Sequence, residues 1–171
     1  MTGWGRSLAR SALLPVAAVL LGGCITTAGV IPSPFQCATV NQQALKYINW
    51  AKVPEVNIRI RNGEFSPMIL RLRQGWPYVL RIRNRDHEAR LFKAHDFLNK
   101  TAVVKTTVAG VDDDTPCLTS ISIPARESVE LKLVAVTDGY FEYEDSLIPW
   151  PGLISTGPNG IIIVEERRPR I

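Results

Sequence analysis

The sequence is poor in the side chains that most catalytic and metal centres need. It contains three cysteines, two histidines and two methionines in 171 residues, so soft metals have few possible ligands. It has no G-x-S-x-G, no H-E-x-x-H and no glycine-rich phosphate loop, the patterns of serine hydrolases, zinc hydrolases and nucleotide-binding proteins. We therefore expect no catalytic residues and a protein that is not an enzyme.

The one long apolar run lies at the amino terminus. It covers residues 11–21, after Arg6 and Arg10, and is shorter than the roughly 20 residues that a membrane-spanning helix needs. A basic start, a short apolar core and small residues before a cleavage point are typical of a secretory signal peptide. We expect residues 1–23 to be such a signal, with no transmembrane helix after it.

The signal ends in Leu21-Gly22-Gly23-Cys24, which resembles the lipobox of bacterial lipoproteins. The resemblance implies cleavage before Cys24, lipid attachment to its thiol through acyl chains such as palmitate, and a membrane-anchored protein that faces the periplasm. Two or three acyl chains, at about 0.8 kcal/mol per buried methylene, anchor a protein durably. The alternative is an ordinary secretory signal followed by a chance cysteine.

The charge balance excludes one class of partner. Of 20 basic side chains, the loss of Arg6 and Arg10 leaves 18 against 16 acidic ones. This small excess in an extracytoplasmic protein gives no support to a nucleic-acid partner.

Cys37 and Cys117 remain after processing. Outside the cytoplasm such a pair is usually oxidised, so we expect a disulfide. Two thiols in a soft metal site are the alternative, although neither cysteine has a histidine or another cysteine nearby in the sequence.

The remaining chain is typical of a turn-rich β protein, with 12 glycines and 12 prolines. Apolar residues alternate with arginines in its first three predicted strands, which is typical of strands with one buried face. The predicted strands are Val56–Ile60, Leu70–Arg73, Tyr78–Arg83, Arg90–Lys93, Thr119–Ile123, Val129–Ala135, Tyr140–Glu144 and Ile161–Val164. Residues 38–52 contain one short amphipathic helix at best, and we expect Leu98–Leu118 to be an irregular insertion.

These patterns divide the chain into five segments. After the signal at 1–23 we expect a lipidated tether at 24–37, a helical extension at 38–55, a single β domain at 56–166 and a basic tail at 167–171.

Several short motifs in the β domain resemble those of cupredoxins, the blue-copper family. They are Phe65-Ser66-Pro67, Gly75, Asn84, Ile123-Pro124-Ala125 and Gly139-Tyr140-Phe141-Glu142-Tyr143. The resemblance covers about residues 56–165. It implies an all-β, cupredoxin-like Greek-key β-sandwich of seven or eight strands with one short N-terminal helix.

The same resemblance implies that the copper ligands have been lost. Arg90, Asp145, Trp150 and Pro158 stand at or near the ligand positions of the family, whereas blue copper needs a thiolate and two imidazoles. We expect no cofactor. We hypothesise that Arg90 and Asp145 form an ion pair in place of the metal, with Glu144 as the fallback acceptor. The alternative is that both side chains face water.

Two other groups could bind cations. His87, His95 and Met68, beside Glu88 and Asp96, are the ingredients of a non-standard copper or iron site. Asp112-Asp113-Asp114 could hold a hard cation, but a solvated acidic loop is the better interpretation because three adjacent aspartates do not match an EF-hand.

Six arginines occupy outward positions of the first three strands: Arg59, Arg61, Arg71, Arg73, Arg81 and Arg83. If these strands share a sheet, the guanidinium groups form one basic face that could dock an acidic protein or meet anionic lipid headgroups. The alternative is a solvated face that discourages edge aggregation. The sequence thus predicts a lipid-anchored binding or assembly protein, with periplasmic copper or iron handling as the alternative.

Overall fold

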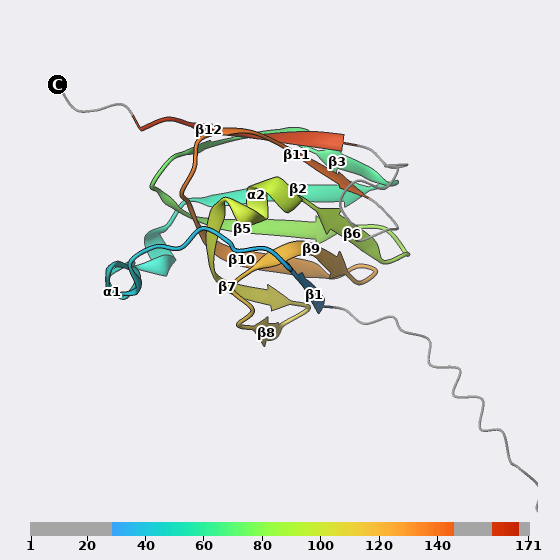
Figure 1. The fold of residues 1–171 in the computed structure, drawn as a ribbon. Helices are drawn as coiled ribbons and strands as arrows, with labels where there is room; N and C mark the ends of the chain where they lie inside the picture. Colours follow the sequence, from blue (N-terminus) through green and yellow to red (C-terminus); the bar gives the residue numbers. More distant parts are fainter. Residues whose placement is uncertain (1–28, 146–158, 168–171) are drawn as a thin grey trace, which may run out of the picture.

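The computed structural model describes residues 29–145 and 159–167, which form two β-sheets packed face to face (Figure 1). The strands of the first sheet are, in spatial order, β1 (Gly29–Pro32), β9 (Leu118–Ile123), β6 (Arg90–Lys93), β11 (Gly139–Asp145), β12 (Asn159–Glu165) and β4 (Ile69–Arg73). Those of the second are β3 (Glu64–Ser66), β2 (Glu55–Arg61), β5 (Pro77–Asn84), β10 (Ser128–Ala135), β7 (Thr101–Val108) and β8 (Val111–Asp113).

The alternating patterns form the strands that the sequence predicts. In β2, Ile58 and Ile60 are buried while Arg59 and Arg61 are exposed, because successive side chains of a strand point to opposite faces. Each predicted strand is present, and the expected β-sandwich is confirmed.

The core between the sheets includes a cluster of aromatic rings. The ring of Tyr143 lies 4.9 Å from that of Phe65 and 5.3 Å from that of Phe92. Its hydroxyl donates to the carbonyl of Pro67 at 2.8 Å, and burial raises the pKa of Tyr143 to about 12. Gly160 faces Tyr143 in β12, and a Cβ there would overlap the tyrosine ring. Glycine is therefore required where β12 passes this ring.

The described residues contain twelve strands, more than the seven or eight expected. The prediction that Leu98–Leu118 is irregular is wrong, because this segment holds the end of α2 (His95–Asn99) and the strands β7 and β8. In the pairing of β7 with β10, Lys105 lies opposite Lys132 and Val103 opposite Leu133. The intervening residue makes a bulge, which interrupts the alternation that would have revealed β7.

The expected solvated acidic loop is partly a strand as well. Asp112 lies in β8, where its carboxylate accepts from the hydroxyl of Thr107 at 2.7 Å and pairs with Lys105 at 2.6 Å. The hydrogen bond from Lys105, followed by that from Thr107, lowers the pKa of Asp112. These contacts give the acidic run a structural role at the edge of the second sheet.

Part of the segment expected to be a tether belongs to the fold. Gly29–Pro32 forms β1 and pairs with β9 at the edge of the first sheet. The chain then runs along the sandwich to α1 (Gln42–Leu45), which lies at the opposite end (Figure 1). The expected helix in 38–52 is reduced to α1 and a 3₁₀ helix, Trp50–Lys52.

The predicted disulfide between Cys37 and Cys117 is present, with Cα atoms 5.5 Å apart. It ties the chain after β1 to the loop before β9. No helix within 29–145 and 159–167 is long and apolar enough to cross a membrane.

Candidate functional site

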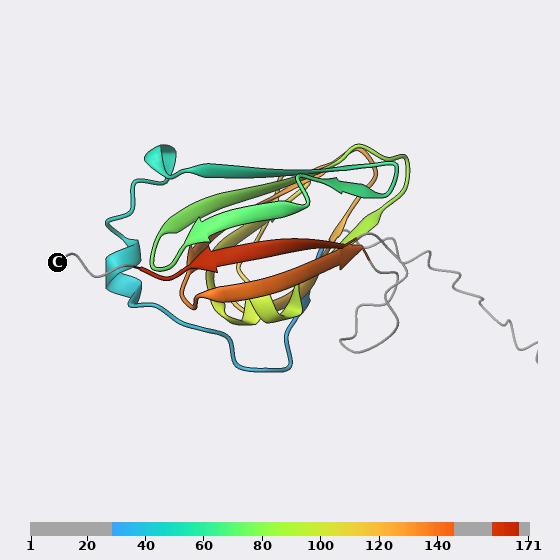
Figure 2. The same ribbon diagram turned by 90° about the horizontal axis from the view of Figure 1, so that it is seen from above.

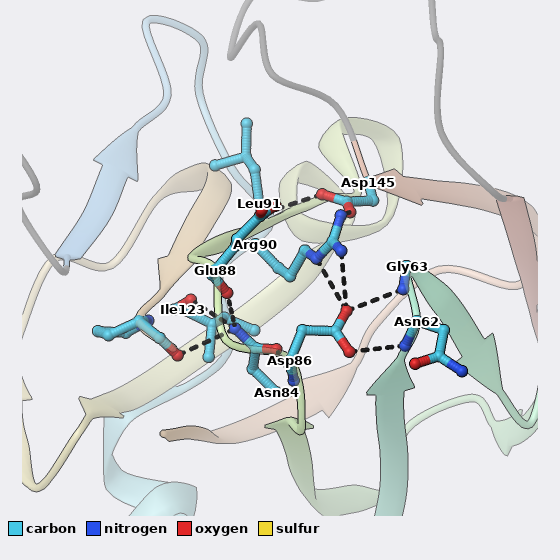
Figure 3. A network of polar contacts seen from close by, with 10 residues as sticks. Asn62, Gly63, Asn84, Asp86, Glu88, Arg90, Leu91, Ile123 and Asp145 are labelled. Atoms are coloured by element: carbon cyan, nitrogen blue, oxygen red, sulfur yellow. Dashed lines mark hydrogen bonds and ion pairs between the residues drawn. The ribbon is translucent and has the colours of Figure 1, made fainter. Parts of the chain in front are cut away.

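Three segments that are distant in the sequence meet at one end of the sandwich. They are the turn between β2 and β3, the loop from β5 to the start of β6, and the end of β11 (Figures 1 and 3). Asn62 and Gly63 form the two-residue turn, with φ values of 53° and 75°. Positive φ at both positions is the signature of a type I′ hairpin turn, for which Asn-Gly is the favoured sequence.

Arg90, the first residue of β6, bridges two carboxylates. Its Nη1 lies 3.0 Å from Oδ2 of Asp145, while its Nε and Nη2 lie 3.0 Å and 2.9 Å from Oδ2 of Asp86 (Figure 3). The other oxygen of Asp145 accepts from the backbone N–H of Leu91 at 3.1 Å. The predicted ion pair between Arg90 and Asp145 is thus present, and it belongs to a larger network.

Asp86 is the member of the network that the sequence interpretation missed. It is 9% exposed, and its carboxylate accepts from the backbone N–H groups of Asn62 at 2.6 Å and Gly63 at 2.8 Å. Burial alone would raise the pKa of Asp86, but these two N–H groups and the Arg90 guanidinium outweigh it and lower the pKa. The carboxylate is therefore ionised where it joins the β2–β3 turn to β6.

Asn84 fixes the loop that carries Asp86. Its fully buried side chain donates to the carbonyls of Glu88, Ile123 and Pro124 at 2.8, 3.2 and 3.0 Å, and its oxygen accepts from the N–H of Asp86 at 2.9 Å. A side chain with two donors and an acceptor suits this position. These hydrogen bonds explain why residue 84 is an asparagine, which in the sequence alone is only one of the cupredoxin-like motif residues.

The guanidinium of Arg90 lies against the turn at Gly63. A Cβ on Gly63 would stand 3.6 Å from both terminal nitrogens of Arg90, which is ordinary contact distance, so its positive φ is the reason for glycine here.

A second ion pair joins the same two strands. Lys93 of β6 lies 2.7 Å from Glu144 of β11, and the lysine side chain is only 8% exposed. Glu144 therefore pairs with Lys93 in β6, while Asp145 is the acceptor for Arg90.

The residues at this end do not fit a blue-copper ion. A guanidinium has no lone pair to offer a metal, and the nitrogens of Arg90 donate to Asp86 and Asp145. Among the described residues, no group of three or more His, Cys, Asp or Glu side chains could hold a metal ion. Trp150, Pro158 and the acylation candidate Cys24 lie outside the described residues.

The ingredients of the alternative metal site are not brought together. His87 contacts Arg126 before β6, whereas His95 follows β6, contacts Asn99 and packs on the ring of Phe35 at 5.5 Å. Met68 is 55% exposed and precedes β4.

The expectation that six arginines share one face is wrong. The chain crosses between the sheets at Pro67, so β4 belongs to the first sheet while β2 and β5 belong to the second. The outer face of the second sheet carries Arg59, Arg61, Arg81 and Arg83, and that of the first carries Arg71 and Arg73.

Two of these arginines have acidic partners. Arg81 pairs with Glu55 at 3.1 Å and with Glu130 at 2.8 Å. The hydrogen bond from Arg81 to Glu130 outweighs its partial burial and raises the pKa of the guanidinium. Arg71 pairs with Glu165 at 3.2 Å.

No protein-family model and no curated protein matches the chain, but solved structures resemble it. Auracyanin B overlaps with a TM-score of 0.48 at 14% identity, covering 81% of this chain and 99% of that one. Auracyanin A, a blue copper protein from the green thermophilic photosynthetic bacterium Chloroflexus aurantiacus, overlaps at 0.42 with 13% identity, covering 65% and 98%.

A multicopper oxidase from Campylobacter jejuni overlaps at 0.43 with 12% identity over 67% of this chain, which spans only 30% of the oxidase. These three solved structures are thus two auracyanins and a multicopper oxidase. At these scores the likeness carries no argument about function, and the β-sandwich rests on the two sheets themselves.

Proposed function

We propose that the protein is a lipid-anchored, extracytoplasmic binding or assembly protein whose cupredoxin-like domain works without a metal. The network of Arg90, Asp86 and Asp145 is the observation that supports this proposal. It lies where the sequence resemblance aligns two copper ligands with Arg90 and Asp145, and it holds the same loops together by charge.

The network gives rigidity and no redox chemistry. Arginine stays protonated at every physiological pH and does not exchange electrons with a partner. Removing one member would leave a buried charge unpaired, which typically lowers stability by about 3–5 kcal/mol. The end of the sandwich therefore acts as a fixed structural element, and the outer faces of the sheets are available for binding.

The proposed partner is a protein with an acidic surface, and the proposed anchor is the acylated Cys24. Exposed arginines on both outer faces support an acidic partner, because a guanidinium binds carboxylates through two parallel hydrogen bonds. A separate role in copper or iron handling has no support from the positions of His87, His95 and Met68.

Adding cupric salt to the purified full-length protein tests the metal-free assignment. We expect no intense blue absorption from the wild type, because among residues 29–145 and 159–167 no thiolate and imidazole converge at this end. Blue colour in the wild type would refute the proposal.

A variant that restores the family's ligands tests the alignment itself. It combines Arg90→His, Asp145→Cys, Trp150→His and Pro158→Met, with Arg90→His alone as the control and circular dichroism as the check on folding. We expect the combined variant to turn blue with copper and the control to stay colourless. A folded but colourless combined variant would show that the network does not occupy the position of the copper ligands.

A further inference from the structure

Exposed apolar side chains gather on one part of the first sheet. Eight large apolar side chains are exposed in the described part of the chain. Five of them lie on or beside β4, β12 and β11: Met68, Ile69, Trp76, Tyr140 and Ile161. Figure 2 shows these strands side by side, with β12 in red between β11 in orange and β4 in green. Contiguous exposed apolar surface of this kind marks interaction sites.

The strand register places these side chains in adjoining rows. Ile161 lies between Ile69 of β4 and Glu142 of β11, and in the next row Ile163 lies between Arg71 and Tyr140. The intervening residues of these strands, such as Leu70 and Ile162, face the core. The outer surface of β4, β12 and β11, which we call the β4 face, therefore has an apolar centre, bordered by Arg71 and Arg73 and by Glu142 and Glu165.

In the part of the chain that the structure describes, one edge of β4 has no strand beside it. The N–H of Ile161 donates to the carbonyl of Met68 and the N–H of Gln74 donates to the carbonyl of Glu165. In a parallel ladder alternate residues bond to the same neighbour, so Ile69 and Arg71 direct their N–H and C=O groups away from β12. Within the described residues, β4 is the last strand of the first sheet.

The composition of the β4 face matches that of binding hot spots, which are enriched in Trp, Tyr and Arg. Trp76 is 47% exposed and lies under the guanidinium of Arg73, 5.9 Å from its ring centroid, and Tyr140 is 81% exposed. On the second sheet, Arg59 lies opposite Arg83, Arg61 opposite Glu64 and Arg81 opposite Glu130. An acid also reaches the β4 face, where Glu165 pairs with Arg71, so the exposed rings of Trp76 and Tyr140 are what distinguish this face.

We propose that the β4 face is the docking surface, and that its occupant is an extended segment of a protein partner that pairs with β4. This inference rests on the proposed function, since it takes the binding role as given. It assigns that role to the face that carries Arg71 and Arg73 and not to the outer face of the second sheet. A strand added to a free edge gains backbone hydrogen bonds, and its alternate side chains supply specificity. Opposite Ile69 and Arg71, the matching segment carries an apolar residue and, two positions along, an acidic one, because every second residue of a strand shares a face.

Photocrosslinking in intact cells that produce the full chain tests this surface. Benzoylphenylalanine replaces Ile69 or Ile161 on the β4 face, and in matched controls it replaces Arg59 or Arg83 on the second sheet. We expect adducts from positions 69 and 161 only. The crosslinked peptide, sequenced by mass spectrometry, is expected to contain an apolar and an acidic residue two positions apart.

The other outcomes each decide a separate point. Adducts from positions 59 and 83 alone would overturn the β4 face and leave the proposed binding function intact. An adduct of the β4 face with lipid, or with a second copy of the chain, would overturn the assigned occupant. Adducts from none of the four positions would contradict both the docking surface and the binding function.

A defined probe gives a second readout. We expect a fluorescent peptide that repeats Val-Thr-Glu-Thr, which puts valine and glutamate on one face of a strand, to bind the full-length protein in detergent micelles and to slow amide exchange at Ile69 and Arg71. Arg71→Ser with Arg73→Ser should weaken binding at least tenfold, and Arg59→Ser with Arg83→Ser less than twofold. Equal weakening by both pairs, or no protection of these amides, would overturn the proposal.

Discussion

At the scale of single residues, Asp86 joins the parts of the arginine network. Its carboxylate receives two backbone N–H groups of the Asn62-Gly63 turn and the guanidinium of Arg90. Each of these contacts favours the charged form, and together they outweigh the effect of burial on its pKa. Stability that depends on a depressed carboxylate pKa is present above the pKa of the unfolded chain and is lost in acid as the pH falls through the folded pKa.

Asp86→Asn should therefore lower the free energy of unfolding by about 3 kcal/mol at neutral pH, since it leaves buried donors without a charged acceptor. Urea denaturation between pH 7 and the acid range measures it. We expect the difference from the wild type to shrink in acid, where the wild-type carboxylate is protonated as well.

Asp112→Asn is the matched control, because Asp112 is also paired but lies at the exposed edge of the second sheet. We expect it to leave the unfolding free energy nearly unchanged. If the difference in unfolding free energy between Asp86→Asn and the wild type stays constant with pH, the charge of Asp86 does not have the role given to it.

At the scale of secondary-structure elements, the described N-terminal segment depends on contacts far along the chain. β1 is a four-residue edge strand that pairs only with β9, and a strand of this length gains little stability alone. The Cys37–Cys117 disulfide fixes the same segment and closes a loop with a sequence separation of 80.

The double variant Cys37→Ser, Cys117→Ser should lower the free energy of unfolding by about 4 kcal/mol, the chain-entropy value for a loop of this length. Chemical denaturation with and without a reducing agent measures the effect. The reductant should destabilise the wild type to the same extent and leave the double variant unchanged. If the reductant also destabilises the double variant, the loss of unfolding free energy does not come from this disulfide alone.

At the scale of the whole molecule, the chain enters the fold at the end that holds the arginine network. Gly29 pairs with Ser122 of β9, and Ser122 pairs with Leu91, the neighbour of Arg90. Cys24 lies five residues before Gly29, and five residues reach at most about 18 Å. A lipid on Cys24 would therefore keep this end of the sandwich close to the bilayer.

Cys24→Ser should move the protein from the membrane fraction to the soluble fraction, because the acyl chains proposed on this thiol would supply the anchor. Cell fractionation measures this, and mass spectrometry of the wild type should show the added acyl groups. Retention of the variant in membranes would refute the anchor and would leave the metal-free fold untouched.

The sequence by itself determined the features that depend on local pattern. Alternation of apolar residues and arginines located β2, β4 and β5, because one side of a strand in a sandwich faces the core and the other faces water. The resemblance to cupredoxins pointed to Arg90 and Asp145, and a cysteine pair in a chain expected to lie outside the cytoplasm implied a bond between them.

Only the tertiary structure decided which segments are neighbours. The sheet to which β4 belongs follows from a crossing at Pro67 that no periodicity records, and this crossing separates Arg71 and Arg73 from the other arginines. Asp86 belongs to the network because the β2–β3 turn folds against it. The bulge in β7 breaks the alternation of apolar and polar residues, so β7 could not be predicted from that pattern. Pairing between distant segments depends on the packing of the whole chain, whereas alternation depends on one strand and the water beside it.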